Sequence, residues 1–202
     1  MKQINKDKII LASGSPRRKE LMIQAGIEFK IHVTDIDESK VDVGIAPENY
    51  VSLLSQIKAQ AVAPSYPDAW IIGADTIVAL DNTILGKPAG HQQAEDMLSQ
   101  LSNKEHSVFT AFTITRPSTN EAVTRVVNTR VRFKALSKDE IKWYASTNEP
   151  YDKAGGYGIQ GIGAFLVKEI SGSYTNVVGL PVCELIDALA SLGAISFKEK
   201  RE

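Results

Sequence analysis

A short turn near the start of the chain has the residues expected of an anion-binding site. It reads Leu-Ala-Ser-Gly-Ser-Pro-Arg-Arg over residues 11–18. The apolar residues before it are typical of a buried strand, while Ser15 is a good N-cap and Pro16 suits the first position of a helix. A helix N-terminus favours anions, and Arg17 and Arg18 add full positive charges. The pattern predicts a phosphate site, although a well-capped turn with two solvated arginines would have the same sequence.

A second stretch places a carboxylate inside an apolar run. Asp75 and Thr76 interrupt the apolar residues of 69–80. Burying a carboxylate is costly unless it is paired, bound to a metal or used in catalysis. We therefore expect Asp75 to be a general base or a metal ligand. The alternative is an aspartate at the end of a strand, capping the next turn.

Three other charged positions suit the same chemistry. The acidic residues of 35–38 follow a predicted strand and could hold a cation near the phosphate turn, although acidic loops are commonly just solvated. Lys58 lies beside the apolar face of a helix that is expected to begin at Pro47. Lys87 lies in Gly-Lys-Pro, a constrained loop, where it is a candidate for a second phosphate ligand.

Residues 152–163 are rich in glycine. Glycine at this density disfavours a helix and suits a loop whose backbone approaches a ligand. Gln160 within this stretch carries an amide that can read the edge of a nucleobase. A flexible surface loop is the alternative interpretation.

The remaining pattern predicts the elements that position these residues. Strands and helices alternate irregularly, which favours an α/β fold: a mixed twisted sheet in two lobes with a central cleft, formed by residues 1–202 as a single domain. The expected strands are 9–12, 29–33, 107–115 and 122–133, the last two forming a hairpin. The expected helices are 16–25, one from Pro47, 92–101, one with a capping box at Ser137, and 182–192, and residues 197–202 are expected to form a charged tail.

Composition limits the class of function. The 202 residues are 43% hydrophobic and 23% charged, with a formal net charge of −1, which predicts a globular protein that binds no nucleic acid. No stretch has the pattern of a signal sequence or a membrane span, so we expect a cytoplasmic protein without membrane association. Cys183 falls in an apolar helical pattern and is expected in the core. The histidines lack the spacing of a zinc site.

The motifs at 12–18, 73–76, 86–88, 152–161 and 176–181 follow one another in an order that resembles the Maf family of nucleoside triphosphate pyrophosphatases. The resemblance covers nearly the whole chain. At Arg17, Thr76 and Gln160 the sequence resembles the branch of the family that acts on dTTP and UTP.

This resemblance implies a fold related to the ITP pyrophosphatases and hydrolysis between the α- and β-phosphates. It implies that Asp75 is the proton acceptor and that Asp75 and Glu38 bind a divalent cation, Mg²⁺ or Mn²⁺. The residues implied to bind the nucleoside triphosphate are Ser13, Arg17, Arg18, Lys58 and Lys87 for the phosphates, with Thr76 and Gln160 for the pyrimidine. Similar proteins can form homodimers. The alternatives are action on modified nucleotides and a nucleotide-sensing regulator of cell division without catalysis.

Overall fold

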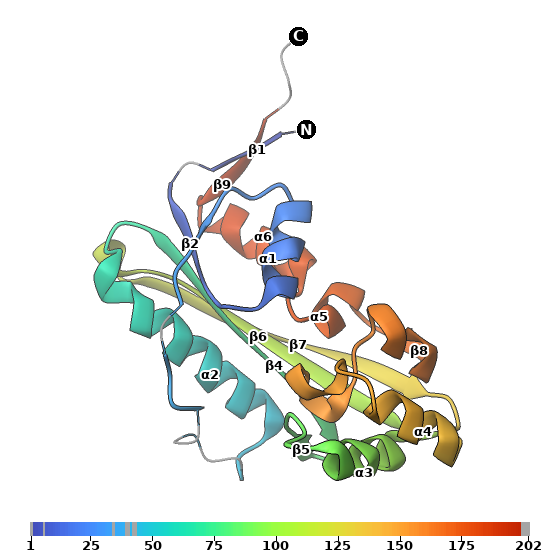
Figure 1. Ribbon diagram of the computed structural model, residues 1–202. Coiled ribbons are helices and arrows are strands. Elements are labelled where there is room, and N and C mark those ends of the chain that lie inside the picture. Colours follow the sequence, from blue (N-terminus) through green and yellow to red (C-terminus); the bar gives the residue numbers. More distant parts are fainter. Residues whose placement is uncertain (1, 6, 34, 39–40, 42–43, 199–202) are drawn as a thin grey trace.

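A seven-stranded mixed sheet forms the centre of the fold (Figure 1). The computed structural model describes residues 2–5, 7–33, 35–38, 41 and 44–198. The strand order is β3-β2-β4-β6-β7-β8, and β5 pairs with β4 outside this path. The strands are β1 Lys2–Asn5, β2 Ile9–Ala12, β3 Lys30–Ile31, β4 Trp70–Leu80, β5 Thr83–Leu85, β6 Glu105–Arg116, β7 Glu121–Phe133, β8 Val167–Ser171 and β9 Ile195–Lys198.

The sheet combines both strand directions, as predicted. Strand β2 runs parallel to β3 and β4, while the pairs β4–β6, β6–β7 and β7–β8 are antiparallel. The long hairpin of β6 and β7 is confirmed. A turn at Asp81 and Asn82, which both have positive φ, joins β4 to β5.

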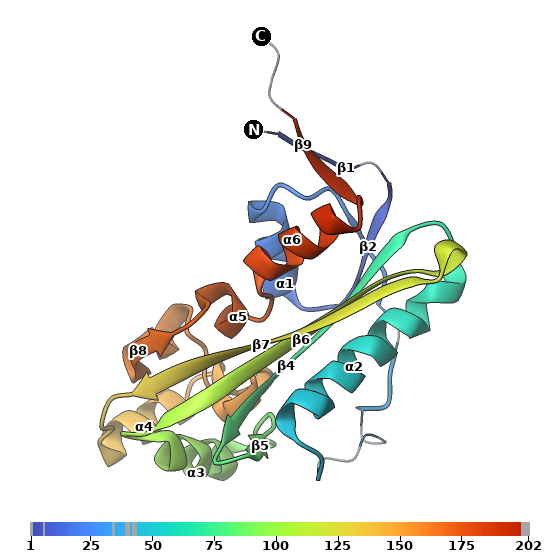
Figure 2. The same ribbon diagram turned by 180° about the vertical axis from the view of Figure 1, so that it is seen from behind.

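Helices cover both faces of this sheet (Figures 1 and 2). Helix α2 lies on one face, and the other α-helices lie on the opposite face. The α-helices are α1 Pro16–Gln24, α2 Pro47–Val62, α3 His91–Leu101, α4 Lys138–Ala145, α5 Tyr174–Val178 and α6 Val182–Ser191. The short 3₁₀ helices are η2 Ala63–Ser65, η3 Pro117–Thr119, η4 Pro150–Asp152, η5 Ala154–Gly156 and η6 Gly161–Leu166.

Two hydrophobic clusters lie along the face opposite α2. Trp70 and Phe112 belong to the first cluster, which also contains residues of α1 and α6; we call this part the first lobe. Val78 and Phe133 belong to the second cluster, which contains residues of α3 and α4 and defines the second lobe. Both clusters draw residues from β4 and β6, so these two strands run through both lobes.

Helix α2 packs so closely against β4 at Gly73 that no space is left for a side chain. A Cβ atom on this glycine would lie 2.3 Å from the Ser55 carbonyl oxygen and 2.5 Å from the Ala59 backbone nitrogen. Only a residue without a side chain permits this approach. The contact brings the helix residue Lys58 over the neighbouring part of β4.

Several local predictions need correction. Asp75 lies inside β4, so the interpretation as a cap at a strand end is wrong. Strand β3 is shorter than the predicted strand 29–33. Residues 197 and 198 belong to β9, which pairs with β1 beside the N-terminal end, so the predicted tail is wrong there, while 199–202 lie outside the described residues.

Cys183 is exposed and not packed in the core as predicted. Helix α6 forms as expected, but it buries Leu185, Ala188 and Leu189. Cys183 precedes Leu185 by two residues, which places it about 200° around the helix axis and therefore toward solvent.

The glycine-rich stretch contains more helix than predicted. Two short 3₁₀ helices, η5 and η6, interrupt the expected loop, and α5 forms in the segment after β8. Within the described part of the chain, no helix has the length and apolar character needed to cross a membrane.

Candidate active site

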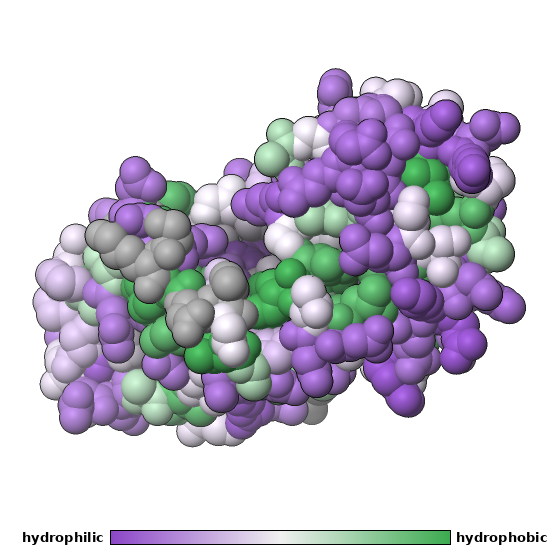
Figure 3. Space-filling view, turned by 90° about the horizontal axis from the view of Figure 1, so that it is seen from below, coloured by the Kyte–Doolittle hydropathy of each residue, from purple (hydrophilic) through white to green (hydrophobic). Residues whose placement is uncertain are grey.

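A cleft opens at the edge of β4 between the two lobes. Strand β2 pairs with β4 only as far as Gly73, and β5 pairs with it from Val78 onward. Residues 74–77 therefore face a gap in the sheet edge, and 75–77 line a cleft of about 650 Å³. The space-filling view shows the surface hollowed there (Figure 3). This volume is typical of sites for small organic ligands.

The structure brings every predicted site residue to this cleft. They come from the β2–α1 turn, the acidic segment, α2, β4, the segment after β5 and the glycine-rich stretch. These residues are Ser13, Arg17, Arg18, Glu38, Lys58, Asp75, Thr76, Lys87 and Gln160. Their roles remain predictions.

Lys58 joins two carboxylates on the α2 side of β4. Its Nζ atom lies 2.5 Å from Asp75 Oδ1 and 2.8 Å from Glu38 Oε1. Asp75 is buried, whereas the side chain of Glu38 is 48% exposed. The ammonium group compensates the cost of placing Asp75 in the sheet interior.

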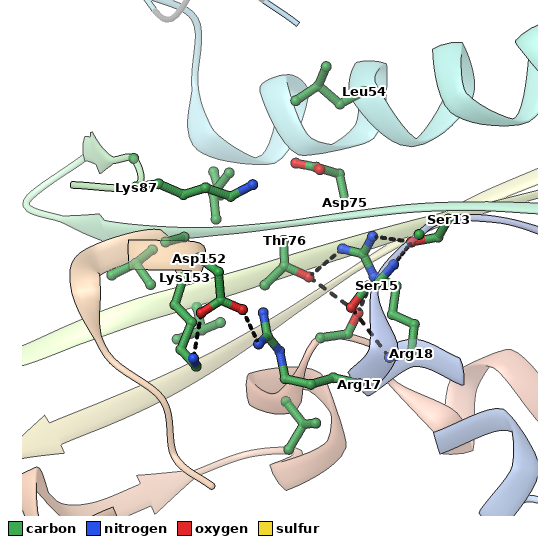
Figure 4. A pocket seen from close by; sticks show the side chains of 18 of the residues that line it. Ser13, Ser15, Arg17, Arg18, Leu54, Asp75, Thr76, Lys87, Asp152 and Lys153 are labelled. Atoms are coloured by element: carbon green, nitrogen blue, oxygen red, sulfur yellow. Dashed lines mark hydrogen bonds and ion pairs between the residues drawn. The ribbon is translucent and has the colours of Figure 1, made fainter. Parts of the chain in front are cut away.

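The next residue points the opposite way. Successive side chains of a strand alternate between faces, so Thr76 faces away from α2 (Figure 4). Its hydroxyl lies 2.9 Å from the Thr110 hydroxyl and 3.3 Å from the Gly179 carbonyl oxygen. Asp75 and Thr76 therefore present a carboxylate and a hydroxyl on either side of the same cleft edge.

Arg18 is buried in the wall of the cleft, and its guanidinium is extensively hydrogen-bonded. Nε donates to the Gly179 carbonyl, Nη1 to the Ala74 carbonyl and to Ser13 Oγ, and Nη2 to Thr76 Oγ1, all at 2.8–3.1 Å. Burial lowers the pKa of Arg18, and the Asp75 charge acts in the opposite direction. The guanidinium thus joins β4, the first turn and the end of α5.

Arg17 reaches across the cleft to the glycine-rich stretch (Figure 4). Its Nη1 atom lies 2.9 Å from Asp152 Oδ2, and Lys153 Nζ lies 2.5 Å from Asp152 Oδ1. Burial acts to raise the pKa of Asp152, but the hydrogen bonds from Lys153 and Arg17 outweigh it and the pKa is lowered. Lys87 and Gln160 are exposed at the cleft.

Three further residues of the cleft are not predicted as site residues from the sequence. Asp152 and Lys153 belong to the glycine-rich stretch, where an adjacent acid and base is a signal for an ion-pair partner of the arginines. Tyr50 of α2 also lines the cleft. Burial raises its pKa, as do the charges of Asp75 and Glu38. Tyr50 belongs to the apolar face of α2, so the sequence pattern indicates a core residue and not a site residue.

The two carboxylates on Lys58 fit a hard divalent cation. Within the described residues, no three His, Cys, Asp or Glu side chains gather into a site that protein groups alone could complete. Mg²⁺, however, commonly takes one or two carboxylates and completes its shell with phosphate oxygens and water. Asp75 and Glu38, which contact the same ammonium, supply such a pair.

The α/β fold of this chain resembles that of a solved structure. It is similar to the structure of the Staphylococcus aureus Ham1 protein, with a TM-score of 0.51 and 13% identity over 92% of this chain and 99% of that one. This likeness concerns the fold.

The chain belongs to the Maf-like protein family, whose model matches residues 8–192. It is 46% identical to a dTTP/UTP pyrophosphatase of Syntrophus aciditrophicus (strain SB) over 95% of this chain and 93% of the relative. It is 48% identical to a dTTP/UTP pyrophosphatase of Geotalea uraniireducens (strain Rf4), over 94% and 97% respectively. The family resemblance expected from the motifs is confirmed.

Proposed function

We propose that this protein is a hydrolase that splits dTTP and UTP into the nucleoside monophosphate and pyrophosphate. The observation that carries the proposal is the carboxylate of Asp75, held by Lys58 inside a cleft that is also lined by Arg17 and Lys87. The relatives named dTTP/UTP pyrophosphatase support the choice of substrate.

Asp75 accepts a proton from a water molecule whose oxygen attacks a phosphorus of the α–β anhydride. The bond from that phosphorus to the bridging oxygen then breaks, giving the two products. Lys58 keeps the Asp75 carboxylate in position, since their atoms lie 2.5 Å apart. General base catalysis of this kind depends on an acceptor within hydrogen-bonding reach of the water.

The cationic side chains neutralise the triphosphate. Arg17 can exchange its contact with Asp152 for phosphate oxygens, and Lys87 and Lys58 add point charges. Ser13 and Arg18 already bond each other, so they hold the phosphate-binding turn in place as well as lining it. Thr76 and Gln160 contact the pyrimidine.

A divalent cation, Mg²⁺ or Mn²⁺, would be held by Asp75 and Glu38 together with the phosphates. When bound, it supplies charge neutralisation on the phosphate oxygens. We place the activity in the cytoplasm, where nucleoside triphosphates are used, and the homodimer implied by the sequence resemblance remains part of the proposal.

Pyrophosphate release from a panel of nucleoside triphosphates with Mg²⁺ tests this function. Asp75→Asn should lower kcat for dTTP and UTP by between about 100-fold and 10,000-fold, the usual contribution of a general base. Asp68→Asn is the matched control, because Asp68 is exposed and lies outside the cleft. It should leave the rate unchanged.

The panel separates this proposal from its alternatives. Full activity of pure Asp75→Asn would exclude Asp75 as the base. Binding of nucleotides without any release of pyrophosphate from the unmodified protein would instead favour a sensor. A much higher rate on modified nucleotides than on dTTP and UTP would show that modified nucleotides are the preferred substrates.

A further inference from the structure

Glu149 lies behind the glycine-rich stretch, and its carboxylate binds the backbone of that stretch. Oε2 accepts a hydrogen bond from the Ile162 backbone nitrogen at 2.9 Å, and Oε1 accepts one from the Gly163 nitrogen at 2.8 Å. The Tyr144 hydroxyl donates to Oε1 at 3.0 Å. Glu149 is not among the residues that line the cleft.

The stretch is folded closely around this carboxylate. A Cβ atom on Gly161 would lie 2.9 Å from Glu149 Oε2, and one on Gly163 would lie 2.6 Å from the Tyr144 hydroxyl and 3.0 Å from Glu149 Oε1. Gly161 also has a φ of +75°. The glycines that suggested a ligand loop in the sequence therefore also serve to admit the Glu149 side chain.

Gln160 lies between two anchored points of the backbone. On its N-terminal side, the Gly158 nitrogen donates to the Tyr144 hydroxyl at 3.2 Å. On its C-terminal side, the Ile162 nitrogen donates to Glu149. Because the same Tyr144–Glu149 pair holds both points, the path of Gln160 past the cleft depends on this pair.

A charged acceptor is the group best suited to this task. A carboxylate offers only acceptors, and its hydrogen bonds to backbone N–H groups are stronger than those of a neutral amide. Burial raises the pKa of Tyr144, and the Glu149 charge acts in the same direction. The tyrosine therefore remains a hydroxyl that donates to Glu149 while it accepts from Gly158.

We propose that Glu149 is a positioning residue that sets selectivity for the pyrimidine by holding the backbone on both sides of Gln160. The inference rests on the proposed function, in which Gln160 contacts the base. It assigns to Glu149 no contact with the substrate. Its effect should therefore appear in the choice between bases more than in the chemistry of the phosphates.

The test compares Glu149→Gln with the unmodified protein in kcat/KM for UTP and for GTP. The amide presents an N–H₂ group where a backbone N–H requires an acceptor, so one anchor is lost at nearly constant size. We expect the ratio of UTP to GTP to fall at least tenfold, with most of the loss on UTP. Glu169→Gln is the control, because Glu169 is an exposed residue of β8 outside the cleft. It should keep the ratio.

A double-mutant cycle separates positioning from a general structural effect. If Glu149 acts through Gln160, then Glu149→Gln should change the ratio little in a Gln160→Ala background. Tyr144→Phe, which removes the hydroxyl that serves Gly158, provides a second variant should Glu149→Gln fail to fold, and it should also lower the ratio.

Each outcome has a distinct meaning. Equal losses on UTP and GTP, or an unchanged ratio in folded Glu149→Gln and Tyr144→Phe, would overturn the role of Glu149. The proposed function fails separately, if the unmodified protein releases no pyrophosphate or does not prefer UTP to GTP.

Discussion

At the scale of single residues, the site depends on how each charge is compensated. Two adjacent arginines have different surroundings, although the sequence predicts both of them as phosphate ligands. Arg17 lies at the cleft in an ion pair with Asp152, whereas Arg18 is only 8% exposed and donates to two backbone carbonyls. Arg17 is therefore the more readily available for a phosphate, and Arg18 secures the edge of β4 that forms the cleft.

His106 provides a prediction at this scale. It is buried on β6, its Nε2 atom lies 2.7 Å from the Tyr157 hydroxyl, and burial lowers its pKa from 6.5 to about 4. Below pH 6.5 the unfolded chain takes up a proton at His106 that the folded chain does not. The free energy of unfolding therefore decreases as the pH is lowered from about 6.5 to about 4. At pH 5 the loss attributable to His106 should be about 2 kcal/mol relative to pH 7.5.

Urea unfolding at pH 7.5 and pH 5 would measure this effect. His106→Gln removes the titrating group and keeps a polar partner for Tyr157. The variant should therefore lose about 2 kcal/mol less on acidification than the unmodified protein. Carboxylates contribute equally to both proteins and cancel in the comparison. Identical losses would mean that His106 does not titrate as its burial requires.

At the scale of elements, the sequence predicted local structure well because the responsible contacts are local. Ser15 caps α1 with Pro16 as its first residue, and Ser137 and Glu140 form the expected capping box. Contacts between distant residues were not predictable in this way. The ion pair of Arg17 and Asp152 joins residues 135 positions apart, and it follows from packing that no local pattern encodes.

The candidate site shows the same division. The residue types and motifs identified the cleft residues, but they did not indicate that Lys58 would join Asp75 to Glu38, nor that Arg18 would be buried. Those arrangements depend on the face of β4 that each side chain occupies and on the helix placed over it. Both are properties of the assembled sheet.

The contact of α2 with Gly73 gives a prediction at this scale. Gly73→Ala places a methyl group 2.3 Å from a backbone oxygen of α2, so the helix must move. We expect a loss of about 1–3 kcal/mol in the free energy of unfolding, as for other overpacked sites. Pyrophosphate release should also fall, because Lys58 moves with the helix away from Asp75.

Gly90→Ala is the matched control for this measurement. A Cβ atom there meets nothing within 4 Å, and Gly90 has an extended φ of −174°. Gly90 is the N-cap of α3, a position where alanine is less favourable than glycine, so chemical unfolding should show a loss of at most about 1 kcal/mol, smaller than the loss for Gly73→Ala. Equal stability of the two variants would contradict the close contact between α2 and β4.

At the scale of the whole molecule, the cleft lies between lobes that are not independent. Strands β4 and β6 run through both hydrophobic clusters, and the hydroxyls of Thr76 and Thr110 meet between these clusters on the same two strands. Separating the lobes would require breaking the sheet within these strands. We therefore expect the chain to unfold as one cooperative unit, in agreement with the single domain predicted from the sequence.

The two tryptophans allow this expectation to be tested lobe by lobe. Trp70 lies in the core of the first lobe, and Trp143 lies on α4 in the second lobe, where its ring packs edge-on against Phe165. Trp143→Phe leaves fluorescence that reports on the first lobe, and Trp70→Phe leaves fluorescence that reports on the second. In each variant the urea midpoint from fluorescence should coincide with the midpoint from circular dichroism, which reports on the whole fold.

Comparing two probes within one variant removes the effect of the substitution on stability. A fluorescence transition that precedes or follows the circular dichroism transition would mean that the lobes unfold separately, and the shared strands would then not couple the two sides of the cleft.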